Sequence, residues 1–176
     1  MNTPTIEQLN NEFSLQVDNN ILHFKTGEGG IPVVEIHNHH SSALISMQGA
    51  HLLSWIPKGK EEVIWLSSEA KFAAGKSVRG GVPICWPWFG AHESNPDFPA
   101  HGFARTVIWQ VINTEALTDG TTRISFATQP QVDNAAMWPP ETSVQYDVTV
   151  GKKLEMEIIT HNNGNEKVNI GQELHT

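Results

Sequence analysis

Short runs of apolar residues, broken by alternating polar ones, dominate the chain from residue 21 to residue 66. Segments rich in Gly, Asn and Pro separate these runs. Strands that recur at this spacing between turn residues are typical of an all-β sandwich or barrel. The pattern therefore predicts antiparallel strands over 21–25, 33–37, 43–47, 52–56 and 62–66.

Strand patterns resume at 106–112 and 121–128, and the clearest hairpin turns at Gly151 and Lys152. Apolar residues occupy every second position on both sides of this turn. One face of the hairpin is therefore apolar and the other polar, as a half-buried antiparallel sheet requires. The apolar positions are Val144, Tyr146, Val148 and Val150 before the turn, and Leu154, Met156 and Ile158 after it.

The N-terminal residues predict one helix. Thr5 stands three residues before Gln8, which is the spacing of a capping box, and a short apolar and polar pattern follows. A capping box marks the first turn of a helix. We expect a helix over residues 6–13 that packs against a sheet edge.

The last ten residues, 167–176, also alternate. Val168, Ile170 and Leu174 fall on one face, which leaves His175 on a polar face beside Gly171. The sequence stops one residue after His175, without a turn or a closing element. We therefore expect one β-sandwich domain over residues 1–176 that is truncated at its C-terminus and forms the N-terminal part of a longer chain.

The segment from residue 77 to residue 105 has neither the two-residue apolar period of a strand nor the 3.6-residue period of a helix. Gly and Pro interrupt it throughout, and it contains Trp86, Trp88 and Phe89. A long irregular segment in a globular chain is usually functional or disordered, and large aromatic residues argue against disorder. The segment is therefore interpreted as a binding or catalytic loop held to the scaffold by its aromatic side chains.

Composition narrows the class of partner. The 176 residues carry a net charge of −8, with 11 Lys and Arg that form no basic run. Binding to nucleic acid or to an anionic membrane needs a clustered basic surface, so we expect neither partner. The N-terminus has neither the basic region nor the apolar stretch of a signal peptide, and Cys85 is the sole cysteine. We expect a cytoplasmic protein.

Two candidate sites are weak. His37, His39 and His40 cluster in the sequence, but Asn and Ser surround them and no carboxylate follows at a ligand spacing, so a solvated turn is favoured over a metal site. Cys85 lies between apolar residues without a visible base, which favours a buried residue over a nucleophile. We therefore assign no metal and no cofactor.

Two arginines and two histidines are stronger candidates. Arg79 precedes Gly80, and Arg105 follows His101 by four residues. Two arginines could clamp an anion through bidentate hydrogen bonds, or pair with nearby carboxylates on the surface. His101 and His175 could transfer protons near neutral pH, or serve as structural histidines. Spacing alone leaves both alternatives open.

The motifs RGGVPICWPWFG and HGFAR, with MQGAHLLSW before them and Leu-His-Thr at the end, change this balance. Together they resemble the glucose-6-phosphate 1-epimerases, the hexose-6-phosphate mutarotase branch of the aldose 1-epimerase superfamily. The resemblance spans nearly the whole chain. It implies an antiparallel β-supersandwich of the galactose mutarotase-like kind, of which this sequence holds the N-terminal part.

The resemblance also implies an activity and roles for four residues. The reaction would interconvert the α and β anomers of an aldohexose 6-phosphate without a cofactor, in a monomer. His175 would be the general acid that protonates the ring oxygen, and His101 would bind near that oxygen. Arg79 and Arg105 match the substrate-binding arginines of the family, and we expect them to hold the 6-phosphate.

The sequence departs from the family at the general base. That base is a Glu in the C-terminal portion of family members, and no Glu of this chain corresponds to it. Glu173 is two residues from His175 on the same strand face, which is a poor position for a base. We therefore expect the 176 residues alone to be inactive. The alternatives are a non-catalytic phosphosugar- or carbohydrate-binding protein on the same fold, an aldose 1-epimerase acting on free sugars, and a metal-dependent β-barrel enzyme.

Overall fold

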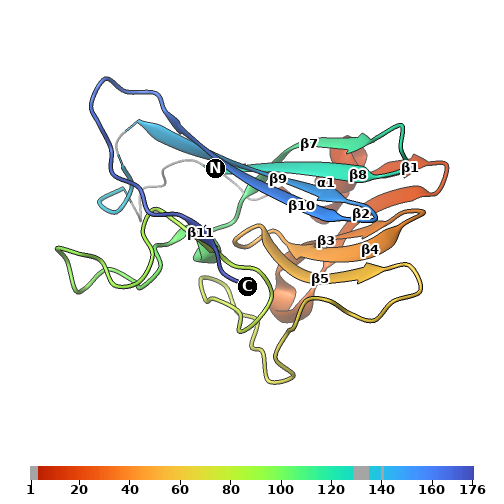
Figure 1. Ribbon diagram of the computed structural model, residues 1–176, viewed down its shortest axis with the longest axis horizontal. Helices are drawn as coiled ribbons and strands as arrows, with labels where there is room; N and C mark the ends of the chain where they lie inside the picture. The colour runs from red at the N-terminus through yellow and green to blue at the C-terminus, as the bar shows by residue number, and fades with distance from the viewer. Residues whose placement is uncertain (1–3, 129–134, 140) are drawn as a thin grey trace.

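The computed structural model describes residues 4–128, 135–139 and 141–176 and arranges their strands in antiparallel sheets (Figure 1). The first sheet has five strands in chain order. These are β1 (Leu15–Val17), β2 (Asn20–Thr26), β3 (Pro32–His37), β4 (Ser41–Ser46) and β5 (His51–Pro57). The prediction of an all-β antiparallel fold is confirmed.

The second sheet has four strands in the order β10-β9-β8-β7. Their bounds are Gln110–Ala116 for β7, Thr122–Thr128 for β8, Thr142–Val150 for β9 and Leu154–Asn162 for β10. The predicted hairpin is confirmed, since Val150 pairs with Leu154 across the turn. The apolar face of the hairpin is the buried one: every second residue of β9 from Thr142 to Val150 lies in the core.

The two sheets share a core built around large aromatic side chains. Trp86, Trp109 and Tyr146 are completely buried, together with Phe24 and Phe126. Burial of side chains of this size supplies most of the favourable free energy of folding. Trp86 belongs to the irregular segment, so that segment is part of the core and not an appendage.

A helix and two single turns complete the regular structure. Helix α1 (Ile6–Phe13) has the predicted capping box, because the Thr5 hydroxyl accepts from the Gln8 N–H and the Gln8 side chain accepts from the Thr5 N–H. The 3-10 turns η1 (Glu28–Gly30) and η2 (Ala104–Thr106) lie in connections. No helix in the described ranges is long and apolar enough to cross a membrane.

The strand predicted over 62–66 is wrong. The segment forms only a bridge between Leu66 and Gly80. The reason is the Glu62 carboxylate, which accepts hydrogen bonds from the backbone N–H groups of Trp55 and Ile64 and from the Ser54 hydroxyl. The chain folds around this carboxylate, so its backbone is not free to form a ladder.

Two other predicted strands are displaced or shortened. The strand expected over 106–112 begins at Gln110, because the preceding residues bond to the connection between β4 and β5: the Gly49 N–H donates to the Val107 carbonyl, and the Trp109 N–H to the Met47 carbonyl. Of the last ten residues, only β11 (Glu173–Leu174) forms a ladder. Their predicted alternation holds, since Leu174 is half-buried and His175 is exposed.

The short strand β11 pairs with β6 (Ile84–Cys85) in a third, two-stranded sheet. Figure 1 shows the result: the C-terminal segment, drawn in dark blue, lies against the irregular segment, drawn in green. Two further backbone bonds join the same segments, from the Gly171 N–H to the Pro87 carbonyl and from the His175 N–H to the Pro83 carbonyl. The fold thus places the end of the sequence on the segment predicted to be functional.

Candidate functional site

The irregular segment is anchored by Trp86. Its ring packs on Phe103 and Trp138 with centroid distances of 5.8 Å and 4.8 Å, and its Nε1–H donates to the Thr160 hydroxyl. Its carbonyl accepts from the N–H of Phe103, 3.1 Å away. Trp86 thus fixes the RGGVPICWPWFG motif to the core, and its carbonyl holds the HGFAR motif in place through Phe103.

Gly102 allows this close approach. A Cβ at residue 102 would lie 2.0 Å from the Trp86 carbonyl oxygen, and the residue has φ 70°. Only glycine accepts both the contact and the left-handed backbone. His101 also has a positive φ, 67°, which a residue with a side chain keeps only when its surroundings hold it. The position of the His101 ring is thus set by the backbone on both sides.

Hydrogen bonds define the tautomer of His101. Its Nδ1 accepts from the Gly90 N–H at 3.2 Å, and its own backbone N–H donates to the Gly90 carbonyl at 2.7 Å. In the neutral ring the proton then lies on Nε2. Burial, followed by the charges of Arg105 and His175, lowers the pKa of His101 and favours this neutral form. His101 therefore presents an N–H donor.

His175 lies beside His101. Their rings are stacked with a centroid distance of 5.9 Å and an interplanar angle of 22°. The pairing of β11 with β6 produces this proximity, and His175 is exposed. The two imidazoles form an open pair that a polar ligand can reach.

Phe89 touches both histidines and was not singled out by the sequence. Its ring packs edge to face on His101 at 4.8 Å and on His175 at 5.8 Å, and 46% of it is exposed. An exposed aromatic ring beside polar groups is common in ligand sites. Its place in the WPWFG motif was the available signal.

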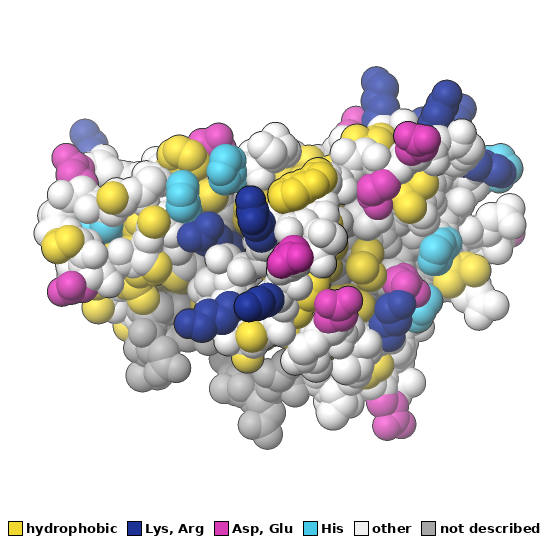
Figure 2. All heavy atoms as spheres, turned by 90° about the horizontal axis from the view of Figure 1, so that it is seen from below, with side chains coloured by type: hydrophobic (Ala, Val, Ile, Leu, Met, Phe, Trp, Pro, Cys, Tyr) yellow, Lys and Arg dark blue, Asp and Glu magenta, His cyan; other side chains and the backbone are white. Residues whose placement is uncertain are grey.

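Arg105 belongs to the same cluster. Its Nη2–H donates to the Ala100 carbonyl at 2.8 Å, and its charge lowers the pKa of His101. Arg79 is exposed and directly precedes Gly80, the residue that bridges to Leu66. Neither arginine forms an ion pair with a residue in the described part of the chain, so pairing with Glu93 or Asp97 is not observed. On the face drawn in Figure 2, Lys and Arg side chains lie beside His and hydrophobic ones and form no continuous basic patch.

The weaker candidates behave as ordinary structural residues. Cys85 is buried as predicted, and burial raises the pKa of its thiol. His39 and His40 lie in the turn between β3 and β4, where the His40 Nε2 is 3.0 Å from the Asp119 carbonyl. Within the ranges that the structure describes, no three His, Cys, Asp or Glu side chains are arranged to hold a metal ion.

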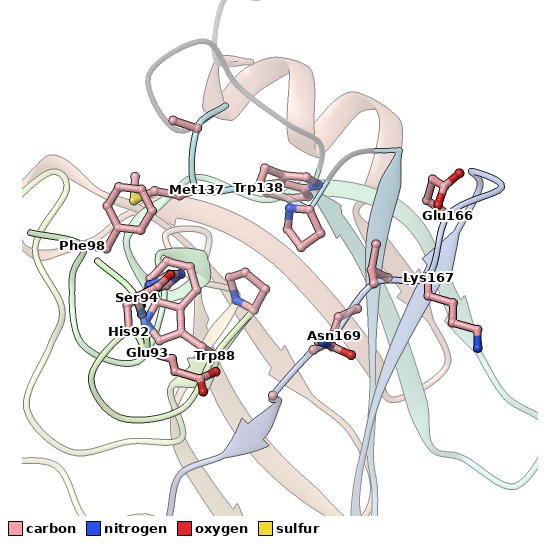
Figure 3. Close-up of a pocket in the computed structure, with 16 residues that line it drawn as sticks. Trp88, His92, Glu93, Ser94, Phe98, Met137, Trp138, Glu166, Lys167 and Asn169 are labelled. Carbon is pink, nitrogen blue, oxygen red and sulfur yellow. Dashed lines mark hydrogen bonds between the residues drawn. The ribbon is translucent and has the colours of Figure 1, made fainter. Parts of the chain in front are cut away.

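A cleft of about 620 Å³ adjoins the site (Figure 3). Trp88, His92 and Phe98 form one wall; the Trp88 ring packs on His92 at 4.6 Å and on Phe98 at 5.9 Å. The opposite wall is the segment 166–171, from which Lys167 extends away from Trp88. The same two segments, the irregular segment and the C-terminal segment, form both the cleft and the histidine pair.

The chain is similar to known proteins over most of its length. The family model described as aldose 1-epimerase matches residues 32–176. A curated relative from Escherichia coli, named "Putative glucose-6-phosphate 1-epimerase", is 37% identical over 131 residues, which are 74% of this chain and 44% of the relative. A relative of the same name from Cenchrus ciliaris is 30% identical over 138 residues, 76% of this chain and 41% of the relative.

Solved structures show the same fold. A crystal structure of a "putative mutarotase" from Salmonella typhimurium superposes with a TM-score of 0.76 and 35% identity, over 83% of this chain and 48% of that one. A galactose mutarotase-like protein from Lactobacillus casei has a TM-score of 0.57 at 21% identity, over 76% of this chain and 45% of that one. The chain thus spans less than half the length of the relatives it matches.

Proposed function

The chain belongs to the aldose 1-epimerase family, and from this premise we propose that it holds the substrate-binding and proton-donating residues of a glucose-6-phosphate 1-epimerase. The observation that carries the proposal is the stacked pair of half-buried His101 and exposed His175 beside Arg105. Two imidazoles next to a cation that forms no ion pair with any described residue suit a polar, anionic ligand that undergoes proton transfer.

The proposed reaction opens and closes the sugar ring. A base removes the proton of the C1 hydroxyl while the His175 imidazolium donates a proton to the ring oxygen. The bond from C1 to the ring oxygen breaks, and C1 becomes an aldehyde carbon. Rotation about C1–C2 followed by the reverse proton transfers closes the ring with the other configuration and restores both groups.

His101 and Phe89 would orient the sugar in this mechanism. The Nε2–H of His101 would donate a hydrogen bond near the ring oxygen, which keeps that atom next to His175. Phe89 would cover one apolar face of the ring. Positioning of this kind contributes to catalysis because the reacting atoms are held at attack distance.

Arg79 and Arg105 would bind the 6-phosphate through charge-assisted hydrogen bonds. Replacing either by Ala should weaken glucose 6-phosphate binding at least about tenfold, as expected for one lost contact of this kind, and leave glucose nearly unaffected. Isothermal titration with both sugars measures the effect. Arg123→Ala is the matched control, because Arg123 lies on β8 near Glu115, with 3.9 Å between Nη1 and Oε2. Equal losses for both sugars would instead favour action on free sugars.

The general base has to come from outside these residues. Glu173 is the nearest candidate in sequence; it lies on β11 opposite Cys85, two residues before His175. Acid and base should stand on opposite sides of the hemiacetal, which residues two apart on one strand do not. We infer that the base is supplied by sequence that corresponds to the unmatched portion of the relatives.

We therefore expect the 176-residue chain to bind glucose 6-phosphate but not to accelerate its anomerisation. Exchange NMR between the α and β signals measures the rate, and titration of the same sample shows that the site is folded. Continuing the chain with the C-terminal portion of the Escherichia coli relative, here called the completed enzyme, should add catalysis. Full activity of the 176 residues alone would refute the inferred location of the base.

The second candidate is a phosphosugar-binding protein without catalysis. In such a protein His101, His175 and the two arginines would hold the phosphosugar without transferring a proton. A completed enzyme that binds glucose 6-phosphate through His101 and both arginines, yet leaves the anomer exchange rate at background, would support this candidate.

A further inference from the structure

The residues Gly49, Ala50 and His51 lie between the two segments that carry the arginines. The Gly49 N–H donates to the Val107 carbonyl at 2.7 Å. A Cβ at Gly49 would lie 2.7 Å from the Arg105 carbonyl oxygen. On the other side, the His51 Nε2 is 2.9 Å from the carbonyl oxygen of Gly80, the residue after Arg79. Gly49 and His51 therefore contact the backbone beside Arg105 and Arg79, respectively.

The backbone around His51 is too closely packed to accept a side chain at Gly49 or Gly81. Gly81 has φ 70°, and a Cβ there would lie 2.4 Å from the His51 Nε2 and 2.6 Å from the Leu52 carbonyl oxygen. Gly49 has φ 77°. Glycine is required at both places because the backbone is left-handed and the neighbours are in contact. The separation of the two arginine-bearing segments is thus fixed by the volume of the His51 ring and the backbone around it.

The His51 ring itself is almost completely enclosed, with 1% exposure. A carbonyl can only accept, so the hydrogen lies on Nε2, and Nδ1 is left as an acceptor. That Nδ1 is buried and has no hydrogen-bond partner among the described residues. Burial, and to a smaller extent the charge of Arg105, lowers the pKa of His51 to about 4, which keeps the ring neutral.

Arg105 has a buried donor that could pair with this acceptor. Its Nε–H is buried and also has no partner within the described part of the chain. A buried donor or acceptor without a partner is costly, so such atoms are normally satisfied by protein or by an ordered water. An orphan acceptor on His51 and an orphan donor on Arg105 can satisfy each other.

We propose that His51 is a positioning residue for the two arginines. Its Nε2–H holds the Gly80 carbonyl next to Arg79, and its Nδ1 accepts from the Arg105 Nε–H, directly or through one buried water, when a phosphate is bound. This contact orients the guanidinium and leaves N–H groups on both terminal nitrogens for the phosphate. The inference rests on the proposed phosphosugar function, and it assigns His51 no contact with the sugar.

Two substitutions in the 176-residue chain test the role. His51→Leu fills similar space but removes both nitrogens, whereas His51→Gln places an N–H near the position of Nε2. Isothermal titration should show glucose 6-phosphate binding weakened about tenfold in His51→Leu and largely restored in His51→Gln, with glucose binding unchanged in both. A melting curve of each variant measures folding separately.

NMR of the unsubstituted protein gives a test that needs no variant. The Arg105 Nε–H signal should shift, and its exchange with water should slow, when glucose 6-phosphate is added but not when glucose is added. An Nε–H signal that is unaffected by glucose 6-phosphate would overturn the role.

The outcomes separate this inference from the proposed function. Equal affinity of the unsubstituted protein for both sugars would refute the phosphosugar function and, with it, the role of His51. A phosphate preference that survives in His51→Leu would refute the positioning role alone. So would a lower melting temperature accompanied by unchanged affinity for glucose 6-phosphate.

Discussion

Replacing His175 by Asn in the completed enzyme is expected to lower kcat for anomer interconversion by about 10²–10⁴-fold, the range that general acid–base catalysis contributes. Asn can still hydrogen-bond to the ring oxygen, but it cannot transfer a proton to it. The stacked His101 stays in place, because the Gly90 backbone and not His175 holds its ring. Glucose 6-phosphate binding should therefore persist while the chemical step slows.

Exchange NMR at saturating glucose 6-phosphate measures this loss. His39→Asn is the matched control: it makes the same chemical change in the exposed turn between β3 and β4, and its rate should equal that of the unsubstituted enzyme. If His175→Asn changed the affinity for glucose 6-phosphate and left kcat intact, His175 would be a binding residue and the acid would have to be sought elsewhere.

The second large effect concerns stability at low pH. Burial lowers the pKa of His51 in the folded protein to about 4, against 6.5 for an ordinary histidine. Below the higher value the unfolded chain takes up a proton that the folded chain does not, so the free energy of unfolding falls as the pH falls. His51 should cost the fold about 2 kcal/mol between about pH 7 and pH 5, and about 3 kcal/mol once the pH is below both values.

Urea unfolding at several pH values from 7 down to 5 measures this dependence, with His51→Gln as the reference because Gln does not titrate. His101, whose pKa is also lowered, titrates in both proteins and cancels in the difference. The lowered pKa values of Glu35, Glu62 and Asp119 act at lower pH. Parallel curves for the two proteins would show that His51 does not carry the pH dependence.

Local patterns in the sequence correctly predicted the elements that are stabilised by residues close to one another in the chain. The capping box of Thr5 and Gln8 and the alternation of β9 and β10 are of this kind. The errors arise where a distant partner competes for the backbone. The Glu62 carboxylate accepts from the N–H groups of Trp55 and Ile64. The connection between β4 and β5 bonds to Val107 and Trp109, before the start of β7.

The site was predictable only in part for the same reason. His101 and His175 could be named from their motifs, but their stacking depends on the pairing of β11 with β6, and no spacing in the sequence encodes that register. His51 lies in a segment that resembled a turn between two strands. Its role depends on the Gly80 carbonyl and on the burial of its Nδ1, which only the folded chain shows.

The shortness of β11 has a consequence for how the protein responds to heat. Two residues of ladder and a few backbone bonds from Gly171 and His175 attach the C-terminal segment to the loop, whereas the main sheets have ladders of up to nine residues. Segments with few buried contacts open locally before the whole domain unfolds. Such an opening would carry His175 away from His101 and leave both sheets intact. The histidine pair should therefore separate on warming and form again on cooling without unfolding of the two sheets.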